Sequence, residues 1–150
     1  MDVKLQVQRV PRFYINRLVE IDSNWNPRDW SEKLFDLEFD NQHARIFGIF
    51  ENEDLLGYLI AHVVIDEAHI VSLGVDSQRR RQGLGRNLLQ AVVARLRLES
   101  IRDITLDVRV SNIAARELYK SEQFYEAGLR RQFYSDNNED GITMRRTLSL

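Results

Sequence analysis

The chain has 150 residues, a length typical of one domain, of which 43% are apolar and 29% charged. Its formal net charge of -2 argues against a globally basic protein that binds nucleic acid or membrane surfaces. Cysteine is absent, which excludes disulfides, thiolate nucleophiles and Cys-ligated zinc, and three scattered histidines predict no metal site. Because neither a membrane span nor a signal peptide is evident, we expect one cytoplasmic domain over residues 1–150, without membrane or nucleic-acid contacts.

The first half of the chain alternates between helical and strand-like spacing of apolar residues. Proline is suited to the first position of a helix, and Asn-Pro is a helix-start signal. The predicted elements are a half-buried strand at residues 3–8, a helix from Pro11 through Tyr14, Leu18 and Ile21, a helix begun by Asn26-Pro27 with the apolar stripe Trp30, Leu34 and Leu37, and an antiparallel meander of strands at 44–50, 55–65 and 69–75.

The second half contains the strongest helical pattern, at residues 84–96, where apolar residues recur on one face. A strand at 104–110, a helix at 112–120 and two strands at 124–134 and 142–148 follow, and the loop at 135–141 is polar. We expect its acidic residues Asp136, Glu139 and Asp140 to be solvated. This order predicts an α+β fold with a single mixed, largely antiparallel central sheet flanked by helices.

An arginine- and glycine-rich turn, residues 79–86, precedes the strongest helix and reads Arg-Arg-Arg-Gln-Gly-Leu-Gly-Arg. Glycines at a helix start allow close approach of a ligand, and the first-turn amides bind anions, while arginines pair with phosphate oxygens. Leu88 replaces the third glycine of the dinucleotide fingerprint, and Arg86-Asn87 replace the Lys-Ser/Thr of the P-loop. We interpret the turn as a pyrophosphate site; the alternative is a solvated arginine run.

The pattern Arg-x-x-Gly-x-Gly at residues 80–85, after Leu73-Gly74-Val75, resembles the acetyl-CoA signature of the GCN5-related N-acetyltransferase superfamily. The order of the predicted elements is also similar to that family. The resemblance implies the acyl-CoA N-acyltransferase fold, and acetyl-CoA as the acetyl donor with no metal. It further implies that Leu73, Gly74 and Val75 line the pantetheine arm, and that Arg81, Gln82, Gly83, Leu84, Gly85 and Arg86 hold the pyrophosphate.

A second motif, residues 106–112, runs from a strand into the helix that carries Tyr119. Asn112 and Tyr119 are seven residues apart, about two helical turns, and therefore share one face. The strand period places Asp107 opposite the face that carries Leu106 and Val108. A carboxylate and a phenol near one junction suit acetyl transfer from a thioester to an amine, since one accepts a proton and the other donates one. Without a cysteine or a Gly-x-Ser-x-Gly elbow, direct transfer is favoured over an acyl-enzyme.

Within the superfamily the chain is similar to the bacterial ribosomal-protein-alanine N-acetyltransferases (RimI type). Their Leu-Glu-Val-Arg-x-Ser-Asn and Leu-Tyr-x-Ser-x-Gly-Phe motifs correspond to residues 106–112 and 118–124. This resemblance implies that Asp107 is the general base, Tyr119 the general acid, and Asn112 a cofactor contact. It also implies that the acceptor is a protein N-terminus, the alanine of a small-subunit ribosomal protein. Asp107 is one methylene shorter than the family's glutamate, and Gln123 replaces its glycine.

Other interpretations of these residues remain open. Asp107 could form an ion pair with Arg109 two residues along, and His69 is a weaker candidate for the base. We expect His62 to be structural, His43 to be on the surface, and the acceptor peptide to lie between Trp25–Trp30 and Phe133–Tyr134. The acceptor could also be a lysine or a small amine, or the chain could be a CoA-binding regulatory module with a decayed catalytic pair. A basic nucleic-acid binder is the weakest alternative.

Overall fold

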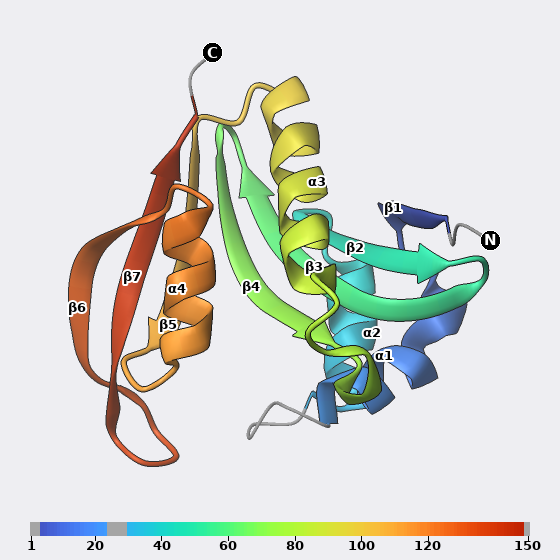
Figure 1. Ribbon diagram of the computed structural model, residues 1–150, viewed down its shortest axis with the longest axis horizontal. Coiled ribbons are helices and arrows are strands. Elements are labelled where there is room, and N and C mark those ends of the chain that lie inside the picture. The colour runs from blue at the N-terminus through green and yellow to red at the C-terminus, as the bar shows by residue number, and fades with distance from the viewer. Residues whose placement is uncertain (1–3, 24–29, 149–150) are drawn as a thin grey trace.

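The computed structural model describes residues 4–23 and 30–148, which form one seven-stranded sheet in the order β1-β2-β3-β4-β5-β7-β6 (Figure 1). Five of the six strand pairings are antiparallel, and β4 with β5 is parallel, so the predicted mixed, largely antiparallel sheet is confirmed. The strands are β1 (Leu5–Arg9), β2 (Ala44–Glu51), β3 (Asp54–Val64), β4 (Glu67–Val75), β5 (Asp103–Arg109), β6 (Tyr125–Tyr134) and β7 (Glu139–Thr147).

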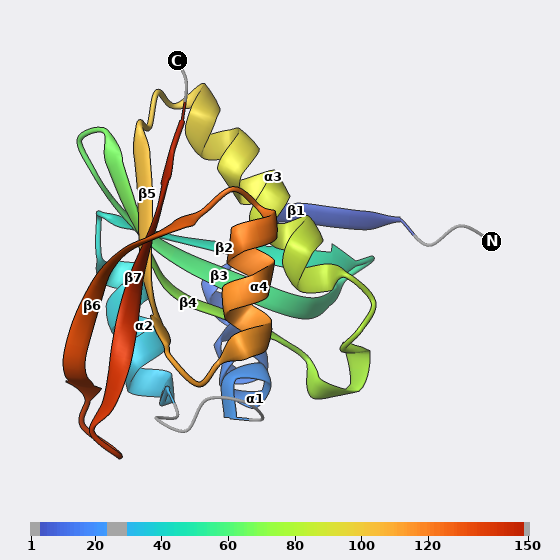
Figure 2. The same cartoon turned by 60° about the vertical axis from the view of Figure 1, so that its left-hand side comes forward.

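Helices cover both faces of this sheet, with α3 and α4 on the same side (Figure 2). None of the helices in the described ranges 4–23 and 30–148 is long and apolar enough to cross a membrane. The helices are α1 (Ile15–Ser23), α2 (Glu32–Asp40), α3 (Leu84–Leu98) and α4 (Ile113–Ser121), with short 3-10 helices η1 (Arg12–Tyr14) and η2 (Ser77–Arg79). The apolar face predicted for α3 is confirmed, since Leu84, Leu88, Leu89, Val92, Val93 and Leu96 are all buried.

The parallel pairing of β4 with β5 is short, and the two strands diverge beyond it (Figure 1). It joins residues 67–70 to residues 103–106 and ends there. Just past that point β4 has a bulge, because Ile60 pairs with Ser72 and Ala61 with Ile70, which leaves Val71 as the extra residue. A bulge re-aims the side chains that follow it. The fold thus opens the centre of the sheet beside a kinked strand.

The N-terminal helices differ from the prediction at Pro11. Pro11 has ψ 150° and caps η1 instead of occupying the first helical position. The expected helix start Asn26-Pro27 lies outside the described residues, and α2 begins after Ser31, whose hydroxyl accepts a hydrogen bond from the Leu34 amide at 3.3 Å. Among the residues after this cap, Phe35 is buried whereas Leu34 is 43% exposed.

Leu37, the last residue of the stripe predicted for α2, is also outside the core, with 57% of its surface exposed. Phe35 instead packs edge-on against Tyr58 of β3, with ring centroids 5.7 Å apart. The apolar side of α2 is therefore carried by Phe35, and Leu34 and Leu37 face away from the sheet.

Of the three acidic residues expected to be solvated in the polar loop, Asp136 is exposed and Glu139 and Asp140 are half-buried, and all three also bind neighbouring groups. Asp136 pairs with Arg109 at 2.8 Å, and Glu139 accepts a hydrogen bond from the Ser111 amide at 2.7 Å. Asp140 accepts one from the amide of Gln132, whose φ of 50° marks an irregularity in β6. The loop is therefore built onto the end of β5 and fixes the segment that leads into α4.

Candidate active site

A cleft of about 700 Å³ opens where β4 and β5 diverge. Its volume lies within the range of about 300–1,000 Å³ that is usual for small-molecule sites. Of the predicted site residues, it is lined by Leu73 and Val75 of β4, Gly85 of α3, Asp107 of β5, and Asn112 and Tyr119 of α4. Trp30 and Tyr134 also line it, whereas Trp25 of the expected acceptor segment lies outside the described residues.

The glycine turn at the start of α3 has the backbone geometry that anion binding requires. Gly83 caps the helix with φ 75° and ψ 15°, in the left-handed region that favours glycine. It offers no side chain to the first-turn amides, so those of Leu84, Gly85 and Arg86 have no partner within the helix. Because the side chain of Leu84 is buried in the core, only the backbone of this residue is available to a ligand.

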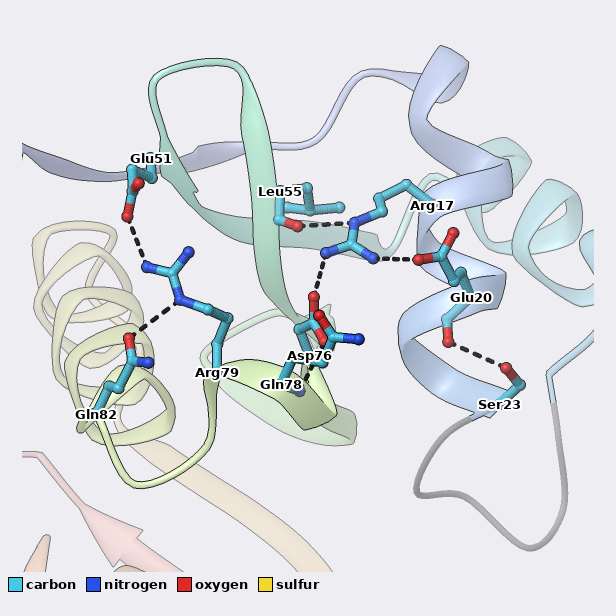
Figure 3. Close-up of polar contacts among 9 residues, drawn as sticks. All are labelled: Arg17, Glu20, Ser23, Glu51, Leu55, Asp76, Gln78, Arg79 and Gln82. Atoms are coloured by element: carbon cyan, nitrogen blue, oxygen red, sulfur yellow. Dashed lines mark hydrogen bonds and ion pairs between the residues drawn. The ribbon is translucent and has the colours of Figure 1, made fainter.

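The arginines of this turn fall into two groups. Arg79 points toward Glu51 and Gln82, at 2.6 and 3.1 Å (Figure 3). Arg86 donates to Glu122 of the segment after α4, at 2.7 Å, and to Ser121 at 2.8 Å. The side chains of Arg80 and Arg81 are exposed. Arg86 is also exposed, so the two groups differ in their contacts: Arg79 and Arg86 tie the turn to neighbouring segments.

A second group of polar contacts holds the end of β4 just before the turn (Figure 3). Asp76 accepts a hydrogen bond from the Gln78 amide at 2.9 Å, which caps η2, and another from Arg17 of α1 at 2.6 Å. The hydrogen bond from Arg17 lowers the pKa of Asp76 below its ordinary 3.8. Arg17 also donates to the Leu55 carbonyl at 3.0 Å, so α1, β3 and η2 meet at this guanidinium.

Tyr119 reaches the cleft from α4 with only 7% of its surface exposed. Its ring packs edge-on against Phe124, at a centroid distance of 5.6 Å. Burial, with a smaller contribution from Tyr134, raises the pKa of the Tyr119 phenol above its ordinary 10.0. The hydroxyl is therefore protonated at neutral pH, as a proton donor must be. Asn112 caps α4, where its side-chain oxygen accepts from the Ala115 amide at 3.2 Å.

Asp107 lies on β5 with its side chain 12% exposed, on the face opposite Leu106 and Val108 as predicted. Its Oδ1 accepts a hydrogen bond from the Thr143 hydroxyl of β7 at 2.6 Å. Its Oδ2 lies 3.6 Å from Nη1 of Arg130 and 3.8 Å from Nε2 of His69. The carboxylate is thus held on one oxygen and faces two basic side chains with the other.

The alternative in which Asp107 pairs with Arg109 is wrong. Arg109 instead binds Asp136 at 2.8 Å and Glu139 at 3.4 Å, and its guanidinium stacks over the Tyr134 ring at 4.1 Å. Residues two apart on one face of a strand are separated by about 7 Å, so their side chains can contact different neighbours.

A buried polar chain beside the cleft was not anticipated from the sequence. Asp22 of α1 is fully buried and accepts hydrogen bonds from the Trp30 amide at 2.5 Å and the Tyr58 hydroxyl at 2.6 Å. The Tyr58 hydroxyl also meets that of Ser72 in the bulged part of β4, at 2.9 Å. Since Trp30 and Ser72 line the cleft, this series of hydrogen bonds holds that part of the cleft wall in place.

The predictions for the other histidines are confirmed. His62 is held by Glu38 at 2.7 Å, and His43 is exposed. Within residues 4–23 and 30–148, no group of three or more His, Asp or Glu side chains is placed to bind a metal ion.

The model of the acetyltransferase (GNAT) family matches residues 15–124. The chain belongs to this family. That match spans the helices around the cleft, both strands that border it and the glycine turn. The acyl-CoA N-acyltransferase fold and the family expected from the two motifs are thereby confirmed.

Curated relatives are similar over most of the chain. The [ribosomal protein bS18]-alanine N-acetyltransferase of Escherichia coli strain K12 is 39% identical over 125 residues, 81% of this chain and 82% of the relative. A putative enzyme of the same name from Bacillus subtilis is 30% identical over 145 residues, 96% of each chain. The crystal structure of the ribosomal-protein-S18-alanine N-acetyltransferase from Escherichia coli superposes with a TM-score of 0.91 and 32% identity, covering 98% of this chain and 96% of that one.

Proposed function

We propose that this protein transfers an acetyl group directly from acetyl-CoA to a protein N-terminal amine, that of the N-terminal alanine of ribosomal protein bS18. The observation that carries this proposal is the meeting of a held carboxylate, Asp107, and a buried phenol, Tyr119, in one cleft. The choice of acceptor rests on the relatives named for it, which are 30–39% identical over most of the chain.

The residues around the cleft are suited to bind acetyl-CoA, the acetyl donor. The amides of Gly83, Leu84, Gly85 and Arg86 would hold the pyrophosphate, because the helix start is capped by a glycine that offers them no side chain. The edge of β4 at residues 73–75 would pair with the pantetheine arm, since β4 is no longer paired with β5 there. When bound, acetyl-CoA supplies an acetyl group already activated as a thioester.

The chemistry then requires two proton transfers. An α-ammonium group, with a reference pKa of about 7.7–8.0, must lose a proton before its nitrogen attacks the thioester carbonyl. Asp107 Oδ2 faces away from its Thr143 bond and accepts that proton. Tyr119 donates its proton to the departing sulfur, and its buried position in the wall keeps water from taking that role. The acceptor peptide would enter between Trp30 and Tyr134, both of which line the cleft.

The test is an acetylation assay with the purified protein, acetyl-CoA and two peptides. The first carries the N-terminal sequence of bS18 with a free alanine amine and at least one lysine; the second is identical but blocked at its α-amine. We expect mass spectrometry to place an acetyl group on the α-amine of the first peptide and none on the second. Acetylation of both peptides at lysine would contradict the proposal in favour of a lysine acetyltransferase. Binding of acetyl-CoA in calorimetry without any transfer would favour a regulatory module.

A further inference from the structure

His69 lies beside Asp107 and has no role in the chemistry described so far. The parallel register pairs it with Thr105, and its Nδ1 meets the Thr105 hydroxyl at 2.8 Å. This contact turns the other ring nitrogen, Nε2, toward Asp107 Oδ2 at 3.8 Å. The His69 side chain is 44% exposed, whereas that of Asp107 is 12% exposed. The imidazole therefore stands between the carboxylate of the cleft and the solvent.

Charged and titratable groups approach this imidazole from three neighbouring strands. Asp107 of β5 faces it, Arg130 of β6 lies across Asp107, and His62 of β3 is its direct cross-strand partner. His62 is itself bound to Glu38 of α2. Burial lowers the pKa of His69 below its ordinary 6.5; Asp107 opposes this shift, and His62 and Arg130 add to it. The imidazole is consequently neutral at neutral pH, with a lone pair available.

By reference pKa, an imidazole is a better final acceptor than a carboxylate for the proton that the α-ammonium loses. Reference values place an imidazolium about 1–2 pKa units below an α-ammonium, and a carboxylic acid about four units below it. Each unit costs about 1.4 kcal/mol, so a proton left on a carboxylate is costly to hold during the attack. In the tautomer whose Nδ1–H donates to the Thr105 hydroxyl, the nitrogen left to receive a proton is Nε2, the one that faces Asp107.

We propose that His69 is the final proton acceptor of the reaction, and that Asp107 relays the proton to it from the acceptor amine. This inference rests on the proposed function. The N–H bond of the α-ammonium breaks, and its electron pair stays on nitrogen and attacks the thioester carbonyl. The proton moves through Asp107 Oδ2, and a new N–H bond forms at Nε2 once the 3.8 Å separation shortens to hydrogen-bond length in the substrate complex. As the C–S bond breaks, Tyr119 gives its proton to the departing sulfur, and the second proton that the amine nitrogen loses restores the phenol. His69 then releases its proton to solvent.

The electrostatic part of the proposal is tested without substrate, by following the His69 ring signal in an NMR pH titration. Asp107→Asn removes the charge that favours the imidazolium, so the midpoint should move to lower pH. Arg130→Gln removes a charge that disfavours it, so the midpoint should move to higher pH. Shifts of opposite sign support the coupling. A midpoint that does not respond to Asp107→Asn overturns it.

The kinetic part compares His69→Gln with His62→Gln, a matched loss of imidazole on the neighbouring strand. We expect His69→Gln to lower kcat by about tenfold or more. It should also abolish the acidic limb of the pH profile, which is the fall of kcat/KM at low pH. The affinity for acetyl-CoA should not change. His62→Gln should retain the kcat and the fall in kcat/KM at acidic pH, moved at most to higher pH because His62 contributes to the lowered pKa of His69. If wild type acetylates the peptide and His69→Gln keeps the wild-type limb and kcat, the relay is wrong and the proposed function stands. If wild type transfers no acetyl group, the proposed function fails and the relay with it.

Discussion

Asp107 and Tyr119 belong to opposite faces of the sheet, yet they line the same cleft. Tyr119 of α4 packs into the core that also contains the buried face of α3. Asp107 points away from Leu106 and Val108, which belong to the same core. The cleft reaches both faces of the sheet because β4 and β5 pair over four residues and then separate. An acetyl donor bound on the side of α4 can therefore meet an amine that enters from the opposite side. Direct transfer of the acetyl group requires this geometry.

The first prediction concerns the phenol. Tyr119→Phe should lower kcat by about 10²–10⁴-fold, because the proton donor is lost while the ring still packs against Phe124. Acetyl-CoA affinity, measured by calorimetry, should not change. Tyr125→Phe is the matched control, since Tyr125 is 52% exposed on β6 and does not line the cleft. A kcat equal to that of the wild type across the pH profile would remove Tyr119 as the acid.

The glycine turn gives the second prediction. Gly83→Ala should cost about 1–2 kcal/mol, because φ 75° is a left-handed conformation that a Cβ disfavours, although there is space around it. Since 1.4 kcal/mol corresponds to tenfold in affinity, acetyl-CoA binding should weaken by about an order of magnitude if the turn shifts. Gly128→Ala, also in open space but without a positive φ, should change neither binding nor the free energy of unfolding. Equal behaviour of the two variants in calorimetry would contradict this account.

The sequence predicted the elements whose pattern is local and strong. In α3, six apolar residues recur at helical spacing, and all six are buried, so no tertiary contact was needed to identify that face. In α2, Trp30, Leu34 and Leu37 also fit a stripe, but the packing of Phe35 against Tyr58 turns another face of the helix toward the core. The strength of a hydrophobic pattern therefore decides whether the sequence alone suffices.

The same distinction holds in the site. Asp107 and Tyr119 were predicted as site residues because each lies within a local motif, and the structure places both in the wall of the cleft. The strand period fixed the face of Asp107. His69 was named only as a weaker candidate for the base, and Thr143 and Arg130 were not predicted, because these neighbours depend on the register of β5 with β4 and β7 and of β7 with β6. Thr143 is 36 residues away in sequence, and no local pattern connects it to Asp107.

The two groups of turn arginines lead to the third prediction. Arg86→Gln should lower the free energy of unfolding by about 1–3 kcal/mol, because it leaves the 10%-exposed carboxylate of Glu122 with only neutral donors, Gln90 among them. Arg81→Gln, at an exposed position, should change stability by less than about 0.5 kcal/mol but weaken acetyl-CoA binding, most at low salt. Urea unfolding and calorimetry on both variants provide the comparison. The division of the arginines is wrong if both variants lose stability equally.

The fourth prediction is a pH dependence of stability at the contact between α1 and η2. Because Arg17 lowers the pKa of Asp76 in the folded protein, the contribution of this carboxylate is fully present above its ordinary 3.8. It is lost as the pH falls through the lower folded value. Asp76→Asn should therefore destabilise the protein by about 1.5–3 kcal/mol at neutral pH, the usual contribution of a charged hydrogen bond, and by progressively less in acid.

A double-mutant cycle with Arg17→Gln isolates this pair. Arg17 also binds Leu55 and Glu20, so Arg17→Gln alone removes more than one contact, and only the coupling energy reports on Asp76. That coupling should be favourable at pH 7 and fall toward zero in acid, as followed by urea unfolding at each pH. A coupling near zero at pH 7 would show that Asp76 acts only through its cap on the Gln78 amide, a role that asparagine also fills.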